Sequence, residues 1–298
     1  MRSPAITLLT RVCLTSLCTI VLWSAPATFS GERALEFTRK AVSFGARPPG
    51  TPAIKQLQAY ITAQVKAHAG ASMTSDDFTA TTPKGAVAMR NLIARFPGKS
   101  GKAIVISGHY DTKWLPGFVG ANDGGSSTGF LLEMLNALQG APREDDVWLV
   151  WLDGEEAYNE WSETDSLYGS RHLAQKWLAD GTAAKVKALI NIDMIGDKNL
   201  GVTYDMNSTA SLRSLVWQTA DRLGFRDSFP RNPMEMGDDH QPFLRAGIKA
   251  LDVIDFDYGP QNSWWHNSKD SMDKLSANSF RIVGTVILSV IPQIEAWR

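Results

Sequence analysis

Residues 147–156 have the sequence VWLVWLDGEE, in which an apolar run is followed directly by the acidic side chains of Asp153, Glu155 and Glu156. A short continuous apolar run is typical of a strand that is covered on both faces, as in a parallel sheet. Further strand candidates are residues 87–95, 103–107, 188–192 and 250–254. We therefore expect these stretches to form one mainly parallel central sheet.

Segments with helical periodicity alternate with these strands. Apolar residues recur at helical spacing in residues 31–44, 52–68, 126–138, 170–178, 210–223 and 278–297. This alternation predicts an α/β protein, a three-layer sandwich with a central, mostly parallel (mixed) twisted sheet between helices.

The composition indicates a soluble globular protein with a sizeable core, since 44% of the 298 residues are hydrophobic and 20% are charged. The formal net charge is −1, which provides no positive field to attract nucleic acid. No repeat or long linker divides the chain after its first residues. We expect a single catalytic domain over residues 28–298, acting as a monomer.

The N-terminal residues resemble an export signal. Arg2 and Arg11 accompany an apolar stretch at residues 12–23, and the small residues at 25–27 suit cleavage. We expect a signal peptide over residues 1–27 and a periplasmic or secreted mature chain without a membrane span. An uncleaved N-terminal membrane anchor is the alternative, although the apolar stretch is shorter than the roughly 20 residues a spanning helix needs.

Both cysteines, Cys13 and Cys18, lie inside this N-terminal segment. The mature chain therefore has no thiol for catalysis, for a disulfide or for zinc ligation. Any metal ion must be held by carboxylates and imidazoles.

Polar side chains follow three of the predicted strands at the point where each strand ends. His109 and Asp111 follow one strand, the acids of residues 153–156 follow another, and Asp193 follows a third. Ligands of open α/β sheets bind at the carboxyl ends of the strands. Each side chain alone would be interpreted as a capping or turn residue, but their convergence predicts an active site.

Two loops add further candidates. Asp123 lies in the glycine-bearing stretch GANDGGS (120–126), where it could equally be a helix N-cap. His266 follows two tryptophans in a late loop, where a lone histidine is more often structural. Glu155 and Glu156 come directly after a buried strand, and burial of an unpartnered carboxylate is costly, so a cation is the expected partner.

Taken in order, the motifs HYD (109–111), Asp123 in its glycine-rich loop, DGEE (153–156), DMIG (193–196) and His266 resemble the zinc-dependent exopeptidases that include bacterial leucyl aminopeptidases. The segment FGARPPGT (44–51) resembles the opening segment of that family. This resemblance implies the zinc-exopeptidase fold.

A narrower resemblance is carried by DGEEAYNEWSETDSLYGSRHL (153–173), DDHQPFLRAG (238–247) and the Trp265–His266 pair. These stretches are similar to the animal and bacterial glutaminyl-peptide cyclotransferases. The resemblance implies an acyltransferase that closes the N-terminal glutamine of peptides or proteins into pyroglutamate and releases ammonia. Residues 255–263 depart from the animal pattern at the pocket rim, and the cysteine pair of the animal enzymes is absent.

The cyclase resemblance implies one Zn²⁺ per chain, bound by Asp123, Glu156 and His266. His109 and Asp193 occupy the positions that hold a second ion in two-metal peptidases. In a cyclase, Asp193 is instead a hydrogen-bonding catalytic acid, and His109 orients its neighbours.

The resemblance also assigns the proton transfer to Glu155, which takes a proton from the substrate amine and returns it to the leaving ammonia. Asp238 is expected to bind the amide nitrogen, with an N-cap for a helix starting near His240 as the alternative. Trp161 and Trp265 are expected to line the substrate pocket, with core packing as the alternative.

Two other functions stay open at this point. A two-zinc aminopeptidase would use Glu155 to activate a bridging water, with His109, Asp123, Glu156, Asp193 and His266 as ligands. A binding module without catalysis is the other alternative, because some relatives of this scaffold are receptor ectodomains. Those relatives have typically lost metal ligands that are present here.

The export signal predicts a mature chain that starts near Thr28. Mass spectrometry of the periplasmic or secreted fraction is expected to give that truncated mass. A full-length mass in the cytosol would contradict the prediction, and an intact N-terminus in membranes would indicate an anchor.

Overall fold

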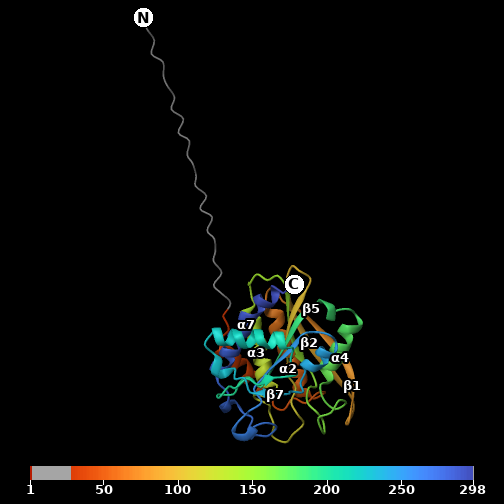
Figure 1. Cartoon of the computed structure of the whole chain (residues 1–298). Helices are drawn as coiled ribbons and strands as arrows, with labels where there is room; N and C mark the ends of the chain where they lie inside the picture. Colours follow the sequence, from red (N-terminus) through yellow and green to blue (C-terminus); the bar gives the residue numbers. More distant parts are fainter. Residues whose placement is uncertain (2–27, 298) are drawn as a thin grey trace.

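The computed structural model describes residue 1 and residues 28–297, so the predicted signal segment lies outside the described residues except for Met1. A central sheet runs through the molecule with helices on both faces (Figure 1). Its strand order is β1-β2-β4-β3-β5-β8. The fold is therefore the predicted α/β sandwich.

The strands of this sheet are β1 (Ser72–Thr82), β2 (Gly85–Phe96), β3 (Ala103–His109), β4 (Asp146–Leu152), β5 (Val186–Asp193) and β8 (Ala250–Ile254). The strands β4, β3, β5 and β8 are parallel, and β2 runs antiparallel to both of its neighbours. A separate two-stranded parallel sheet is formed by β6 (Tyr204–Asp205) and β7 (Pro233–Met234).

Alternate residues of the central strands enter two different hydrophobic cores, as the two-residue period of a strand requires. On β3, Ile104 and Ile106 pack on one side of the sheet and Val105 on the other. The first core is completed by α1 (Gly31–Val42), α2 (Pro52–Ala67), α3 (Gly125–Ala137), α5 (Ala210–Arg222) and α7 (Ala277–Glu295). The second is completed by α4 (Tyr168–Ala179) and α6 (His240–Arg245).

The predicted helices and strands are all present, which confirms the fold class. The strand β1 and the small β6–β7 sheet were not predicted, and α6 begins at His240, where a helix start was considered for the Asp238 segment. The strand β1 is an edge strand with mostly polar residues, which are common on edge strands because they discourage pairing of the open edge with another chain.

Among the described residues, α7 is the one helix that is long and apolar enough to cross a membrane by length and composition. More than half of its apolar stretch, 56%, is buried inside the domain. Its buried side chains, including Val283 and Ile287, belong to the first core. Core packing therefore accounts for the apolar character of this helix.

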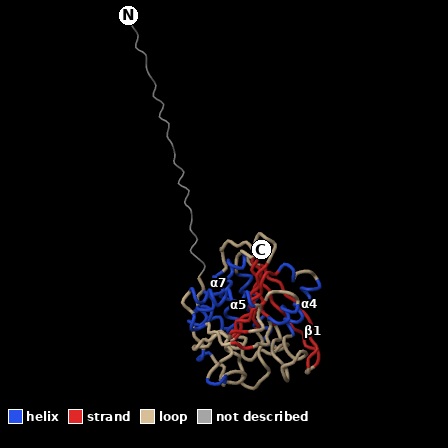
Figure 2. Tube along the Cα trace, viewed as in Figure 1, coloured by secondary structure: helices blue, strands red, loops and turns tan. Residues whose placement is uncertain are grey.

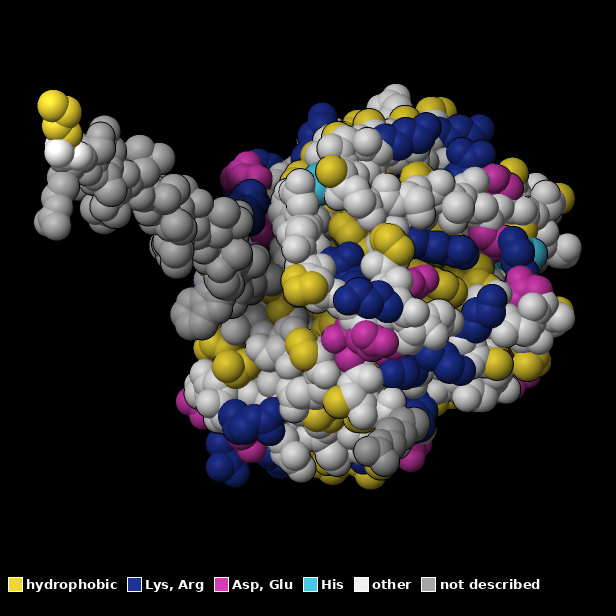
Figure 3. Space-filling model, turned by 90° about the horizontal axis from the view of Figure 1, so that it is seen from above, with side chains coloured by type: hydrophobic (Ala, Val, Ile, Leu, Met, Phe, Trp, Pro, Cys, Tyr) yellow, Lys and Arg dark blue, Asp and Glu magenta, His cyan; other side chains and the backbone are white. Residues whose placement is uncertain are grey.

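Loops gather at the end of the sheet that lies opposite the C-terminus (Figure 2). The strand β7 lies at this end as well (Figure 1). The view from above shows basic and acidic side chains interspersed over the visible face, as the near-neutral net charge predicts (Figure 3).

Candidate active site

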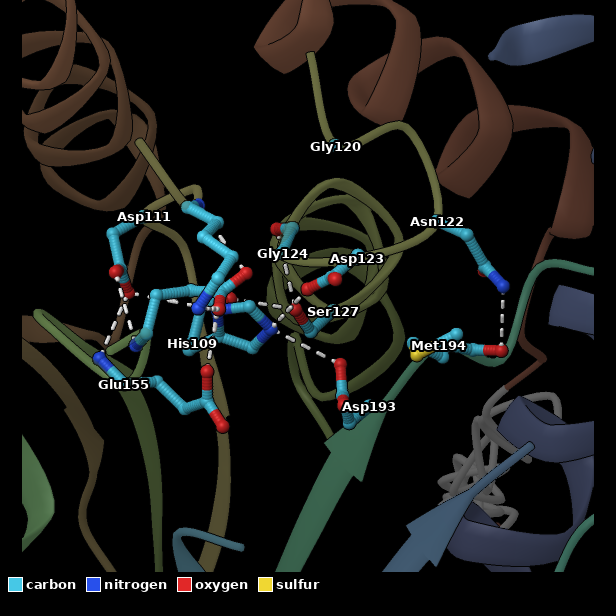
Figure 4. Close-up of polar contacts among 12 residues, drawn as sticks. His109, Asp111, Gly120, Asn122, Asp123, Gly124, Ser127, Glu155, Asp193 and Met194 are labelled. Atoms are coloured by element: carbon cyan, nitrogen blue, oxygen red, sulfur yellow. Dashed lines mark hydrogen bonds and ion pairs between the residues drawn. The ribbon is translucent and has the colours of Figure 1, made fainter. Parts of the chain in front are cut away.

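The site forms where three neighbouring parallel strands end. The strand β3 ends at His109, β5 ends at Asp193, and the acidic segment 153–156 follows β4 directly. Because β3 lies between β4 and β5, their carboxyl ends bring these side chains together. Figure 4 shows His109, Asp123 and Asp193 pointing toward one another.

The loop that carries Asp123 is held in a tight conformation before α3. Gly124 occupies the N-cap position with φ 75°, and a Cβ there would lie 2.3 Å from the carbonyl oxygen of Asp111. Only glycine fits this approach. Since Gly124 is the cap residue, Asp123 is not the N-cap of α3, and its carboxylate is free for the site.

Two buried charged residues fix the loops around the site. The Arg47 guanidinium donates hydrogen bonds to the carbonyl oxygens of Tyr110 and Gly120, at 3.3 and 3.0 Å, and so ties the loop after β3 to the Asp123 loop. The Asp270 carboxylate accepts the backbone N–H of Asp123 at 3.2 Å and the Tyr258 hydroxyl at 2.7 Å.

Asp123, Glu156 and His266 form a group whose ligand atoms all lie within 4.8 Å of one another. The Nε2 atom of His266 is 3.3 Å from Asp123 Oδ2 and 3.2 Å from Glu156 Oε2. Among the residues that the structure describes, neither of these buried oxygens has a hydrogen-bond donor. Two carboxylates and one imidazole facing a common point fit Zn²⁺, which takes three protein ligands in catalytic sites.

The electrostatics of His266 agree with a cation at this point. Burial alone would lower the pKa of His266, but the carboxylates of Asp123 and Glu156 raise it to about 9. The two carboxylates thus favour positive charge beside them. The Trp265 indole stacks on the His266 imidazole, with ring centroids 3.8 Å apart, and so restricts its orientation.

A second group shares Asp123 with the first. The Nε2 atom of His109 lies 3.2 Å from Asp123 Oδ1 and 3.1 Å from Asp193 Oδ1. Burial raises the pKa of Asp193 to about 7, although the adjacent His109 opposes this shift. The position of His109 fits the predicted orienting role, and the same three side chains could also hold a second cation.

Glu155 lies beside the two groups that share Asp123, and it lines a cavity that members of both groups also line. Its backbone N–H donates to Asp111 Oδ1 at 3.1 Å, which fixes the turn after β4 (Figure 4). Burial raises the pKa of Glu155 well above its usual range, against the opposing effect of His109, whose Nδ1 is 3.9 Å from Glu155 Oε2. The Glu155 carboxyl is therefore a better proton acceptor than an exposed glutamate.

Asp238 also faces the cavity, and its alternative interpretation as an N-cap is wrong. The N-cap position of α6 belongs to Asp239, whose side chain makes no capping hydrogen bond. Asp238 Oδ2 instead accepts a hydrogen bond from the Asn191 amide at 3.1 Å.

The cavity has a volume of about 550 Å³. Trp161 lines it and remains 46% exposed, and Trp265 forms another part of the wall. The cavity is also lined by Lys113, Met234 and Phe256, which were not among the predicted site residues. Lys113 follows Asp111 closely, which could have identified it. Met234 lies in the two-residue strand β7 and Phe256 in the loop after β8, and neither segment has a recognisable sequence pattern.

Residues 91–291 match the family model described as peptidase family M28. This match covers most of the chain, and the fold and the convergence of acidic and histidine side chains agree with it. The chain therefore belongs to peptidase family M28.

The relatives narrow this assignment. The chain is 33% identical over 256 residues to the glutaminyl-peptide cyclotransferase-like protein of Bos taurus, covering 76% of this chain and 66% of that protein. The chain thus spans about two thirds of the animal relative. The structure of an Acidobacteriales bacterium glutaminyl cyclase matches with 42% identity and a TM-score of 0.87, over 91% of this chain and 97% of that one.

The Porphyromonas gingivalis glutaminyl cyclase matches with 27% identity and a TM-score of 0.80, over 89% of this chain and 98% of that chain. These similarities confirm the resemblance to glutaminyl cyclases that the sequence motifs indicated.

The geometry predicts that Glu156→Gln releases bound zinc, because the substitution removes a charged ligand from the group of Asp123, Glu156 and His266. Glu155→Gln is the matched control and is expected to retain the metal. Elemental analysis after dialysis measures both variants. Equal zinc content in the two variants would contradict the ligand assignment.

Proposed function

We propose that this protein is a glutaminyl-peptide cyclotransferase, which converts N-terminal glutamine of peptides or proteins into pyroglutamate with release of ammonia. The observation that carries the proposal is the position of Glu155, whose carboxyl shares one cavity with the group of Asp123, Glu156 and His266. The similarity to bacterial glutaminyl cyclases over almost their whole length supports it.

The reaction is intramolecular. The α-amine of the substrate attacks its own γ-carboxamide carbon, a C–N bond forms, and the bond to the amide nitrogen breaks as ammonia leaves. No water is consumed. The protein must fold the two groups together, favour negative charge on the carbonyl oxygen and relocate one proton.

We assign one Zn²⁺ per chain to Asp123, Glu156 and His266. When bound there, the ion supplies a Lewis acid for the γ-carbonyl oxygen. His109, which lies between Asp123 and Asp193, holds both carboxylates in orientation rather than binding a second ion.

Glu155 is the proton shuttle in this proposal. Its carboxylate accepts a proton from the attacking amine and returns it to the departing nitrogen. Asp193 and Asp238 face the same cavity and serve as hydrogen-bonding partners for the substrate nitrogen atoms. Trp161 and Trp265 supply apolar walls that limit the access of water.

The proposals for domain extent, localisation and partners rest on the amino-acid sequence. Residues 28–298 form one catalytic domain that is exported after removal of residues 1–27 and acts as a monomer in the periplasm or outside the cell. We propose that the mature protein has no membrane span, which the packing of α7 inside the domain supports, and no nucleic-acid partner, which the near-neutral net charge supports.

A two-zinc aminopeptidase is the second candidate, favoured by one observation: the group of His109, Asp123 and Asp193 could hold another ion. A single assay of the purified protein separates the two candidates. We expect a peptide with N-terminal glutamine to release ammonia and no free amino acid. Release of free glutamine or of other N-terminal residues would establish the peptidase instead.

Glu155→Gln is predicted to keep zinc and fold but to lower kcat by about 10²–10⁴-fold, because the amide cannot exchange the proton. Substrate binding is expected to survive, so the loss appears mainly in kcat. The matched control is Glu160→Gln, an exposed position in the following loop, which should leave kcat unchanged. Near-native turnover of Glu155→Gln would move the shuttle role to Asp193 or Asp238.

A further inference from the structure

A row of buried polar side chains lies behind Asp238. Ser107 on β3 pairs with Asn191 on β5, which pairs with Asp252 on β8. Neighbouring residues in register project to the same face of a sheet, so the three side chains form one line across the strands. All three are at most 1% exposed. The row lies on the face covered by α4 and α6, and α6 directly follows the segment that carries Asp238.

Hydrogen bonds connect this row to the cavity. The Ser107 hydroxyl donates to Asn191 Oδ1 at 3.0 Å. The Asn191 amide nitrogen donates one hydrogen to Asp238 Oδ2 at 3.1 Å and the other to Asp252 Oδ1 at 3.2 Å. The amide orientation is therefore determined, because a flipped Asn191 would turn its oxygen toward two carboxylates.

The row is unusual for its position in the sheet. The residues two positions earlier on the same strands and the same face are the apolar Val105, Leu189 and Ala250. Apolar side chains would fill such a layer without the desolvation that buried polar groups require. The polar row therefore calls for an explanation beyond packing, and its contact with Asp238 provides one.

The Asp238 carboxylate is held on both oxygens. Oδ1 accepts the backbone N–H of Asp239, and Oδ2 accepts the Asn191 amide. Two donors on different oxygens define the plane of a carboxylate, whereas a single donor leaves it free to rotate. Removal of the Asn191 amide would release the Oδ2 side of the group.

We propose that Asn191 is a positioning residue that holds the Asp238 carboxylate in its orientation toward the substrate. This inference rests on the proposed cyclase function and adds a residue to it. Asn191 acts on turnover only through Asp238, so its removal alters kcat while the group of Asp123, Glu156 and His266 remains intact.

A double-mutant cycle tests this dependence. Asn191→Leu, which has a similar shape and no donor, is expected to lower kcat about 10- to 100-fold, the effect expected for a hydrogen bond to a charged group. In the Asp238→Asn background, the same substitution should lower kcat by less than about twofold. Zinc content and KM are expected to stay close to those of the parent in both backgrounds.

The matched control is Asn91→Leu, the same substitution at a buried asparagine of β2. Asn91 donates to Asp76 Oδ2 at 3.1 Å and to the Gly169 carbonyl oxygen at 3.0 Å, with no contact to Asp238. Its effect on kcat should be the same with Asp238 or Asn at position 238. A merely structural role of Asn191 would give this additive result as well.

Equal effects of Asn191→Leu in both backgrounds would overturn the proposal. Should that variant fail to fold, Asn191→Ala serves in the same cycle, because it also removes the amide donor to Asp238 Oδ2. A fall in kcat that disappears in Asp238→Asn supports the proposal, and an additive fall or no fall overturns it. A wild-type protein that releases no ammonia refutes the proposed function itself. Ammonia release with an additive cycle refutes only the positioning role.

Discussion

The Asp123 carboxylate is the one group on which both halves of the site depend. Its Oδ1 faces His109 at 3.2 Å and its Oδ2 faces His266 at 3.3 Å, so one side chain joins the ends of two segments far apart in the chain. Its backbone N–H is held by Asp270, at 3.2 Å. A shift of this loop would separate the ligand group from the acids around Glu155. The glycines and the buried Arg47 that fix the loop therefore also fix the position of the Asp123 carboxylate in the site.

The second constraint is the concentration of buried acids at one edge of the sheet. Burial raises the pKa of Glu155 and of Asp239 well above the usual range and that of Asp193 to about 7. Such a cluster stays partly ionised only with positive charge beside it. His109, His266 and Lys113, whose Nζ lies 3.7 Å from Glu156 Oε2, supply part of that charge, and the group of Asp123, Glu156 and His266 could hold a cation that supplies more. The same arrangement brings together the proposed proton acceptor Glu155 and the group proposed to hold the metal ion.

Much of this was predictable from the sequence because the central strands are apolar on both faces and end in acids, as VWLVWLDGEE shows. The edge strand β1 could not be predicted in this way, because most of its side chains are polar and exposed and it lacks the apolar run of a buried strand. The metal group was predicted by resemblance, and the structure brings its members together. The capping role considered for Asp238 failed because α6 begins one residue later than that role requires. Asn191 was missed, although a lone polar residue inside an apolar strand is a signal that could have identified it.

The number of metal ions per chain distinguishes the proposed cyclase most directly from a two-zinc aminopeptidase. Crystals of the zinc-loaded protein, measured at the zinc absorption edge, reveal each bound ion by its anomalous signal. We predict one strong peak per chain, contacting Asp123 Oδ2, Glu156 Oε2 and His266 Nε2. A second peak of comparable height beside His109 and Asp193 would contradict it.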